Sequence, residues 1–179
     1  GEVKFFSGQD AAGFGLIVGS QSSGGDIVFM PNFTINGTAG YQRASSGVVP
    51  KKNVYYHIVG VWDKQNEKIH IYIDGILCGT TSVAGAELTI SEKSDSQRIC
   101  IGADTGSGKG ERAFNGTVLL ARMYNTPLVA ADVATLYEQS KRGRSSSGIV
   151  LQGVKYAAEA TVSVGYRYTI YGYGFETGD

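Results

Sequence analysis

This 179-residue chain has no excess charge of either sign, no long apolar run and only three prolines. Lysine plus arginine number 16, and so do aspartate plus glutamate, so the formal net charge is zero. A neutral chain carries no field that would attract a polyanion, and we expect no nucleic-acid partner. No stretch approaches the roughly 18–20 apolar residues that a membrane-spanning helix needs, and we expect no membrane span.

A secretion signal is also lacking at the start of the chain, which opens GEVKFFSGQ without a charged and then apolar segment. We therefore expect a piece of a longer protein, with any export signal upstream. Only two cysteines occur, Cys78 and Cys100, and their spacing matches no metal-ligand motif. Two separate buried thiols are expected, with a disulfide between them as the alternative.

What the chain does contain is glycine and tyrosine, 26 and 11 residues against three prolines. Glycine supplies turn geometry and tyrosine favours a half-buried pleated surface, so the composition is typical of an all-β protein. Short runs at 13–21, 25–33 and 36–44 are broken by Gly, Asn or Pro at spacings of about ten residues. Such spacing predicts a β-sandwich or barrel.

The clearest strand pair lies in KIHIYIDGILCGTTS, residues 68–82. The isoleucines 69, 71 and 73 alternate with polar or aromatic residues, which is the period of two that a strand requires. Asp74-Gly75 separates the two runs, and Asp-Gly is a strong signal for a two-residue hairpin turn. We predict that Asp74 turns the chain and has no catalytic role, and that KQNE at 64–67 makes the preceding turn.

The second half is predicted to contain a strand at 97–104, a glycine-rich loop at 105–116 and a strand at 115–125. The last of these is apolar on both faces, which places it centrally in a sheet. One short helix is predicted at 128–139, with Thr126 as its cap and Pro127 near its first turn. The apolar stripe of this helix is formed by Val129, Val133, Leu136 and Tyr137.

A change of composition follows the helix, where KRGRSSSG at 141–148 is basic and then serine-rich. We expect a sandwich domain over 1–143 and a linker at 144–148. Residues 149–179 return to strand character but are too few for a stable domain alone. They either add strands to the sandwich or begin a second module.

Several catalytic chemistries were weighed against the residues. The segment GADTGSGKGE does not fit a phosphate-binding loop, because Ala103 and Gly110 stand where the motif needs a glycine and a Ser or Thr. No run of paired carboxylates suited to glycoside hydrolysis is present. The two histidines, His57 and His70, lie in strand runs, where packed or cross-strand roles are expected. We expect no enzymatic activity.

A set of ordered motifs resembles the laminin-G and pentraxin-like group of the concanavalin A-like lectin/glucanase superfamily over about residues 5 to 140. The motifs are Tyr56-His57, Val61-Trp62-Asp63, Tyr72-Ile73-Asp74-Gly75, Gly79-Thr80, IGAD at 101–104, FNGTVLLARMYNTPL at 114–128 and DVATLYE at 132–138. The resemblance implies a jelly-roll sandwich of two antiparallel sheets, from which the first strand of the family is absent here. The tail YTIYGYGFETGD resembles the start of an immunoglobulin-like module of the IPT/TIG kind.

Members of this group often bind calcium through aspartates and carbonyls at a sheet rim, so the resemblance implies calcium as a candidate cofactor. Asp26, Asp104 and Asn115 are the candidate ligands, with solvated loop side chains as the alternative. A carbohydrate site needs an exposed aromatic platform beside polar groups. Phe33, Tyr41 and Tyr124 lie near Asn or Gln and are the candidates, with burial in the core as the alternative, whereas Trp62 is expected in the core.

The resemblance implies a non-catalytic, lectin-like accessory module of a secreted or cell-surface protein. Its expected partners are carbohydrate or neighbouring domains of the same protein. The order of modules resembles that of secreted bacterial proteins, in which such regions stand beside metallophosphoesterase-type or glycan-degrading domains. A purely structural spacer beside an upstream hydrolase is the alternative function, because a jelly-roll scaffold hosts many unrelated sites.

Overall fold

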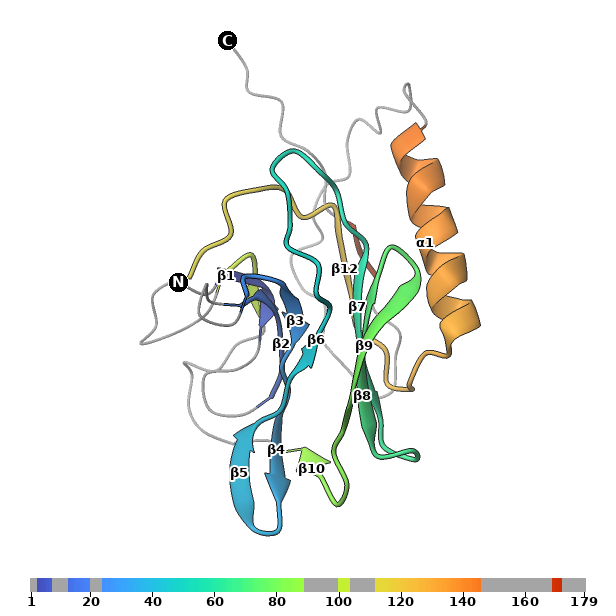
Figure 1. The fold of residues 1–179 in the computed structure, drawn as a ribbon. Helices are drawn as coiled ribbons and strands as arrows, with labels where there is room; N and C mark the ends of the chain where they lie inside the picture. The colour runs from blue at the N-terminus through green and yellow to red at the C-terminus, as the bar shows by residue number, and fades with distance from the viewer. Residues whose placement is uncertain are drawn as a thin grey trace, which may run out of the picture.

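The computed structural model describes residues 3–7, 13–19, 24–88, 100–103, 112–145 and 169–171 (Figure 1). The strands of the first part are β1 (Val3–Ser7), β2 (Gly15–Val18), β3 (Ile27–Phe29), β4 (Asn32–Ile35), β5 (Thr38–Tyr41) and β6 (Ala44–Ser45). The following elements are β7 (Ile58–Asp63), β8 (Lys68–Ile73), β9 (Ile76–Ser82), β10 (Glu87–Leu88), β11 (Cys100–Ile101), β12 (Leu120–Arg122), helix α1 (Ala130–Ser145) and β13 (Thr169–Tyr171).

Two antiparallel sheets form the body of the fold. One has the strand order β11-β1-β2-β3-β6 and the other the order β7-β8-β9. Ile27 and Phe29 of the first sheet share one buried cluster with Ile69, Ile71 and Ile73 of the second. The predicted all-β sandwich is therefore confirmed, and its core is the layer between these sheets. A smaller sheet, β10-β4-β5, extends from it (Figure 1).

Alternation along β8 decides which side chains enter the core. Ile69, Ile71 and Ile73 face the first sheet, while Tyr72 belongs to a separate cluster with Val61 and Val133. That second cluster lies between the β7-β8-β9 sheet and α1, which runs along the side of the sheet away from the main core (Figure 1). The β7-β8-β9 sheet is thus covered on both faces along part of its length.

The β8–β9 turn confirms the prediction for Asp74-Gly75. Both residues have positive φ, 51° and 81°, as a two-residue hairpin turn of the primed type requires. The Asp74 side chain also has a second role, because its Oδ1 accepts a hydrogen bond from the His57 N–H over 2.8 Å. The Asp74 N–H donates to the His57 carbonyl over 2.8 Å. Asp74 therefore forms part of the β8–β9 turn and also holds the backbone of His57, the residue before β7.

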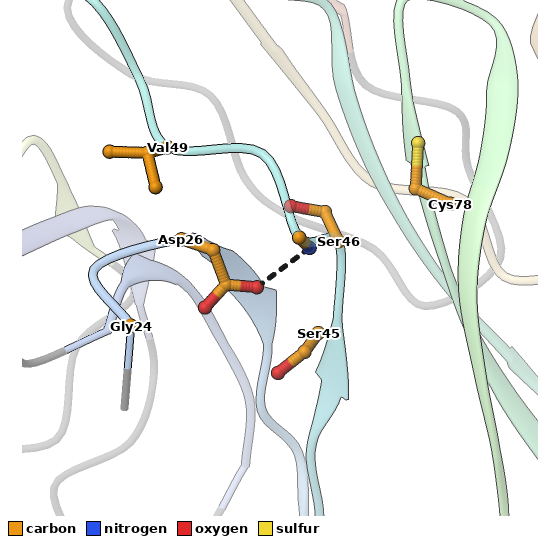
Figure 2. A pocket seen from close by; sticks show the side chains of 7 residues that line it. Gly24, Asp26, Ser45, Ser46, Val49 and Cys78 are labelled. Atoms are coloured by element: carbon orange, nitrogen blue, oxygen red, sulfur yellow. Dashed lines mark hydrogen bonds between the residues drawn. The ribbon is translucent and has the colours of Figure 1, made fainter. Parts of the chain in front are cut away.

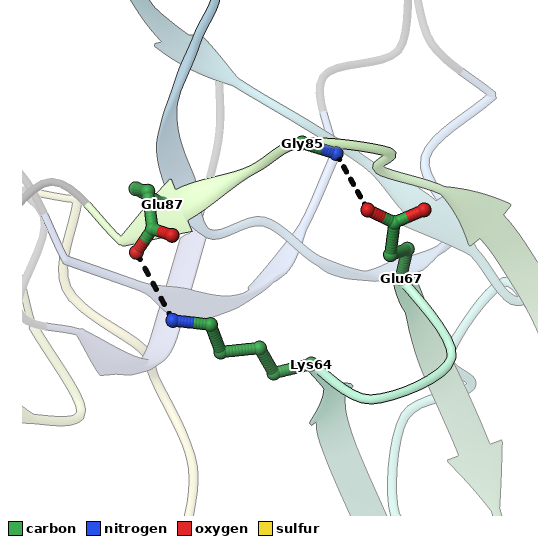
Figure 3. Close-up of polar contacts among 4 residues, drawn as sticks. All are labelled: Lys64, Glu67, Gly85 and Glu87. Carbon is green, nitrogen blue, oxygen red and sulfur yellow. Dashed lines mark hydrogen bonds and ion pairs between the residues drawn. The ribbon is translucent and has the colours of Figure 1, made fainter.

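The β7–β8 turn at 64–67 is also confirmed, and its polar side chains are held (Figure 3). Asp63 accepts hydrogen bonds from the Asn66 side chain and backbone, and these bonds lower the pKa of the Asp63 carboxyl. Lys64 forms an ion pair with Glu87 at 3.1 Å, and Glu67 accepts a hydrogen bond from the Gly85 N–H over 2.9 Å. These contacts tie the turn to the segment that enters β10.

The helix differs from its predicted form in position and cap. It begins at Ala130, so the flanking residue is Val129 and not Thr126. The Asp132 carboxylate accepts from the Val129 N–H over 3.4 Å, which resembles one half of a capping box. Val133 is fully buried, but Val129 is 63% exposed and lies outside the apolar stripe to which it was assigned. Val129 precedes the first residue of the helix, and its side chain faces solvent.

The predicted central strand at 115–125 is wrong in extent and place. Only Leu120–Arg122 is extended, and in the described part of the chain it pairs with β13 alone. Leu119 and Leu120 are exposed. Apolar residues on a surface are common, so an apolar run does not by itself place a strand in the middle of a sheet.

Other expectations meet the structure only in part. Both cysteines are free, and Cys78 is exposed and not buried as expected. Helix α1 continues to Ser145, inside the expected linker, and the domain division stays a prediction. The IPT/TIG-like tail lies outside the described residues except for 169–171. No helix in the described ranges has the length and apolar character needed to cross a membrane.

Candidate functional site

A pocket of about 510 Å³ opens where the edges of the two main sheets meet (Figure 2). Strand β6 is the edge of the five-stranded sheet, and β9 is the edge of the three-stranded sheet. The lining residues are Gly24, Asp26, Ser45, Ser46, Gly47, Val49 and Cys78. The pocket is therefore formed by three segments that are distant in sequence, before β3, around β6 and within β9.

Asp26 is the most unusual side chain in the pocket wall. It is only 5% exposed, and it directly precedes the buried strand β3. Its Oδ2 accepts a hydrogen bond from the Gly47 N–H over 2.9 Å, whereas its Oδ1 is buried and has no hydrogen-bond partner. Leaving a carboxylate oxygen buried and unpaired is unfavourable, and native structures rarely do so without a ligand, ion or water.

The loop after β6 is held against Asp26 by its own backbone. The Ser46 N–H donates to the Ile27 carbonyl over 3.0 Å, and Ser46 Oγ accepts from the Val48 N–H over 3.0 Å. Gly47 between them has a φ of 68°, which a residue with a Cβ adopts at a strain. This conformation turns the Gly47 N–H toward the carboxylate and keeps Ser45 and Ser46 beside it.

Cys78 enters the opposite side of the pocket through a β-bulge. Ile71 pairs with Gly79 and Tyr72 with Leu77, so Cys78 has no partner on β8. Within the described part of the chain, the thiol donates one hydrogen bond, a weak one of 3.4 Å, to the carbonyl of Ile76. Gly79, next along the strand, lies so close to the Ser45 carbonyl that a Cβ would overlap it. The bulge and this close approach bring Cys78 to the pocket rim.

The aromatic residues predicted for carbohydrate binding do not share one site. Phe33 is fully buried, and its ring lies 5.1 Å from that of Trp62, centroid to centroid. The prediction of Phe33 as an exposed platform is therefore wrong, because its side of β4 faces the core. Tyr41 is 45% exposed and pairs with Asn32 across the β4–β5 hairpin. Tyr124 is exposed after β12, on a different segment.

Of the predicted calcium ligands, Asp26 is the one that lines the pocket. Asp26 lies in the pocket, Asn115 is an exposed residue of the segment 112–119, and Asp104 lies outside the described residues. Among the residues that the structure describes, no three His, Cys, Asp or Glu side chains gather as a metal site. Asp26 offers one oxygen of the type that calcium binds, its unpaired Oδ1, whereas calcium takes about six to eight such ligands.

The two histidines occupy structural positions. His70 shares a hydrogen bond of 2.8 Å between its Nδ1 and Thr80 Oγ1, its cross-strand partner on β9. The His57 ring lies 5.9 Å from that of Tyr137 on α1, and its backbone is paired with Asp74. The cross-strand role expected for a histidine is confirmed at His70. Tyr72, beneath α1, has its pKa raised because burial disfavours the phenolate.

The pocket residues Ser45, Ser46 and Cys78 were not predicted from the sequence. None of them interrupts the strand pattern, and the bulge at Cys78 gives no compositional sign. The triplet Gly24-Gly25-Asp26 before a strand was the available signal. It indicates a tight turn that ends in a carboxylate, but not which segment that carboxylate meets.

Comparison with known families and solved structures shows which proteins this chain is similar to. Residues 2–134 match the laminin-G family profile described as the concanavalin A-like lectin/glucanases superfamily. The chain belongs to this superfamily. Among solved structures, this concanavalin A-like domain is similar to an S-layer domain-containing protein (residues 221–444) from Clostridium thermocellum, at 19% identity and a TM-score of 0.40. The alignment covers 76% of this chain and 63% of that one. No curated protein matches this chain.

Proposed function

We propose that the chain is a non-catalytic, lectin-like accessory module of a secreted or cell-surface protein, and that it binds carbohydrate at the Asp26 pocket. The observation that carries the proposal is the buried Asp26 carboxylate, which has one oxygen without a partner in the wall of an open pocket. A sugar presents hydroxyl donors to such an acceptor. The hydroxyls of Ser45 and Ser46 and the exposed side chain of Val49 supply further polar and apolar contacts.

Calcium is the cofactor that this site would use. Asp26 would supply its unpaired Oδ1 as one ligand, and Asp104 and Asn115 stay proposed ligands that are not among the lining residues of the pocket. Once bound, calcium would neutralise the buried carboxylate and accept sugar hydroxyls into its coordination shell. Tyr41 and Tyr124 stay as proposed aromatic contacts for a longer glycan, because both are exposed on other segments of the sandwich.

A structural spacer that packs against neighbouring domains is the second candidate function. It is favoured by large apolar side chains on the surface, among them Ile76 and Leu77 on edge strand β9 and Val129 at the start of α1. Such residues are suited to burial against another domain. On this alternative, Asp26 would serve only to hold the Gly47 loop, and any enzymatic activity would belong to an upstream hydrolase domain.

A glycan array, probed with and without calcium, separates these functions. The unaltered chain, Asp26→Asn and Tyr41→Ala would be compared, with Glu138→Gln as a control for loss of one exposed carboxylate on α1. Selective, calcium-dependent binding that Asp26→Asn weakens at least tenfold, and that Glu138→Gln leaves unchanged, is expected. Silence of the folded, unaltered chain in both conditions would contradict carbohydrate binding and favour the spacer.

A further inference from the structure

Three steps of the sequence place an asparagine or aspartate directly before a glycine, namely Asn36-Gly37, Asp74-Gly75 and Asn115-Gly116. Such a step is chemically labile, because glycine has no Cβ to hinder attack by its backbone nitrogen on the preceding side chain. We propose that Asn36-Gly37 is a self-modification site of the folded chain, where the asparagine converts through a cyclic imide into aspartate and isoaspartate. The reaction needs neither calcium nor a glycan, so the proposal goes beyond the proposed function and does not rest on it.

Asn36-Gly37 forms the tip of the β4–β5 hairpin, at the free end of the smaller sheet (Figure 1). Both residues are exposed, and in the described part of the chain nothing lies within 4 Å of the point where a Gly37 Cβ would stand. The strand pair that flanks the turn is Ile35 with Thr38, so the Gly37 N–H is not one of the ladder donors. Attack requires the turn to leave its positive-φ conformation, and the exposed edge strand β5 opposes this local opening only weakly.

The Asp74-Gly75 step lies in the same kind of turn but is restrained twice. Its carboxylate accepts the His57 N–H over 2.8 Å, which holds the side chain away from the glycine nitrogen. A Cβ on Gly75 would stand 3.0 Å from the Tyr137 ring, so this ring lies close against the glycine backbone. Asp74 and Asn36 share a φ of 51°, so the contacts around the turn, and not its conformation, distinguish the two steps.

The Asn115-Gly116 step is exposed, but an aromatic ring covers its glycine. A Cβ on Gly116 would overlap the Phe114 ring. Two contacts hold this ring in place, because the Phe114 N–H donates to the Gly102 carbonyl over 2.7 Å and the ring centroid lies 4.9 Å from that of Phe5. The backbone rotation that would bring the Asn115 side chain to the Gly116 nitrogen therefore meets a fixed ring. The structure thus separates two Asn-Gly steps that the sequence makes equivalent.

The conversion is an intramolecular acyl transfer followed by hydrolysis. The Gly37 nitrogen loses its proton and bonds to Cγ of Asn36, and the side-chain amide nitrogen leaves as ammonia, taking up a proton. Water then opens the imide ring. Opening at Cγ restores the normal backbone with an aspartate side chain, whereas opening at the backbone carbonyl carbon gives isoaspartate, in which the chain runs through Cγ. Water is the one co-reactant, and no oxidant or cofactor takes part.

Isoaspartate changes the hairpin as well as the residue. It adds a backbone carbon to a turn that fits two residues between Ile35 and Thr38, so the pairing of β4 with β5 is expected to fray from the tip. Either product also adds a negative charge to a chain whose formal net charge is zero.

The test incubates the unaltered full chain at mildly alkaline pH, folded in buffer and unfolded in urea. Peptide mapping by mass spectrometry follows the conversion of Asn36 and Asn115 with time. In urea the two residues should convert at comparable rates, because both precede glycine and neither is covered. In the folded chain Asn36 should convert at least about tenfold faster than Asn115, because less structure must open at the hairpin tip.

Two variants test the cause. Phe114→Leu removes the ring from Gly116 and should raise the folded-state rate at Asn115 while leaving the rate at Asn36 unchanged. Asn36→Gly keeps a residue that tolerates positive φ and removes the reacting amide, so the aged variant should retain the Thr38 amide signal that the aged, unaltered chain loses in NMR spectra. The comparison within the unaltered chain is decisive even if a variant fails to fold. Equal folded-state rates at Asn36 and Asn115, or an Asn36 that converts in urea but stays intact in the folded chain, would overturn the proposal.

Discussion

At the scale of single residues, Asp74 both turns the chain and holds the backbone of His57. Replacing it by alanine removes the acceptor for the His57 N–H and places a residue that disfavours positive φ at 51°. Asp74→Ala should lower the free energy of unfolding by about 1–3 kcal/mol in urea titrations. Asp74→Asn keeps an acceptor and tolerates this φ, so its loss should be less than half as large. Equal losses for both variants would show that the side-chain bond contributes nothing.

A second residue-scale prediction concerns Asp63 and Asn66. Because the bonds from Asn66 lower the pKa of Asp63 in the folded chain, they stabilise it above the unfolded pKa of about 3.9, and this stability is lost as the pH falls through the folded pKa. Asn66→Ala should raise the pKa of Asp63 toward its ordinary value, measured by NMR titration. Stability should then fall less steeply in acid than it does in the unaltered chain. An unchanged Asp63 pKa would contradict this.

Single residues also show where sequence reasoning stops. Asp74 was predictable because a two-residue turn is a local property, set by Asp-Gly and the flanking alternation. The role of Asp26 was not, because its partner, Gly47, is 21 residues away. Phe33 was misplaced for a related reason. The neighbouring Asn32 suggested a polar surface, but which face of β4 meets the core depends on the sheet packed against it.

At the scale of elements, the docking of α1 depends on its few inward residues. Val133 is fully buried with Val61 and Tyr72, whereas Val129, four residues earlier, is exposed. Val133→Ala should lower the free energy of unfolding by about 1–2 kcal/mol, from the apolar surface that it no longer buries. Val129→Ala is the matched control and should stay within about 0.5 kcal/mol. Similar losses at both positions would contradict this docking of the helix.

The strand pairs show the same division between local and distant causes. The β8–β9 hairpin followed from its turn and its alternating isoleucines. The β4–β5 hairpin has an equally local signal, Asn36-Gly37, with φ values of 51° and 77°, although the run predicted at 36–44 includes these residues. The bulge at Cys78 had no signal, because it arises where β9 meets the Ser45 carbonyl of the other sheet.

At the scale of the whole molecule, the two sheets approach each other closely where Gly79 meets Ser45. Gly79→Ala would place a Cβ against the Ser45 carbonyl and should force the sheet edges apart, lowering the free energy of unfolding by about 1–3 kcal/mol. Gly40→Ala is the control, because its Cβ would meet nothing within 4 Å. Thermal and urea unfolding of both variants measure the difference. A neutral Gly79→Ala would show that the sheet edges separate freely.

The site proposed at Asp26 is tested most directly by the amide signal of Gly47, whose N–H is bonded to the Asp26 carboxylate. The measurement is a titration of the isotope-labelled chain with calcium, and then with a glycan selected on the array, followed by NMR. A binding site at Asp26 predicts saturable shifts of the Gly47 and Ser46 amides, which Asp26→Asn abolishes and Glu138→Gln preserves. Saturable binding that leaves both amides unmoved would place the ligand elsewhere on the sandwich and contradict the proposed site.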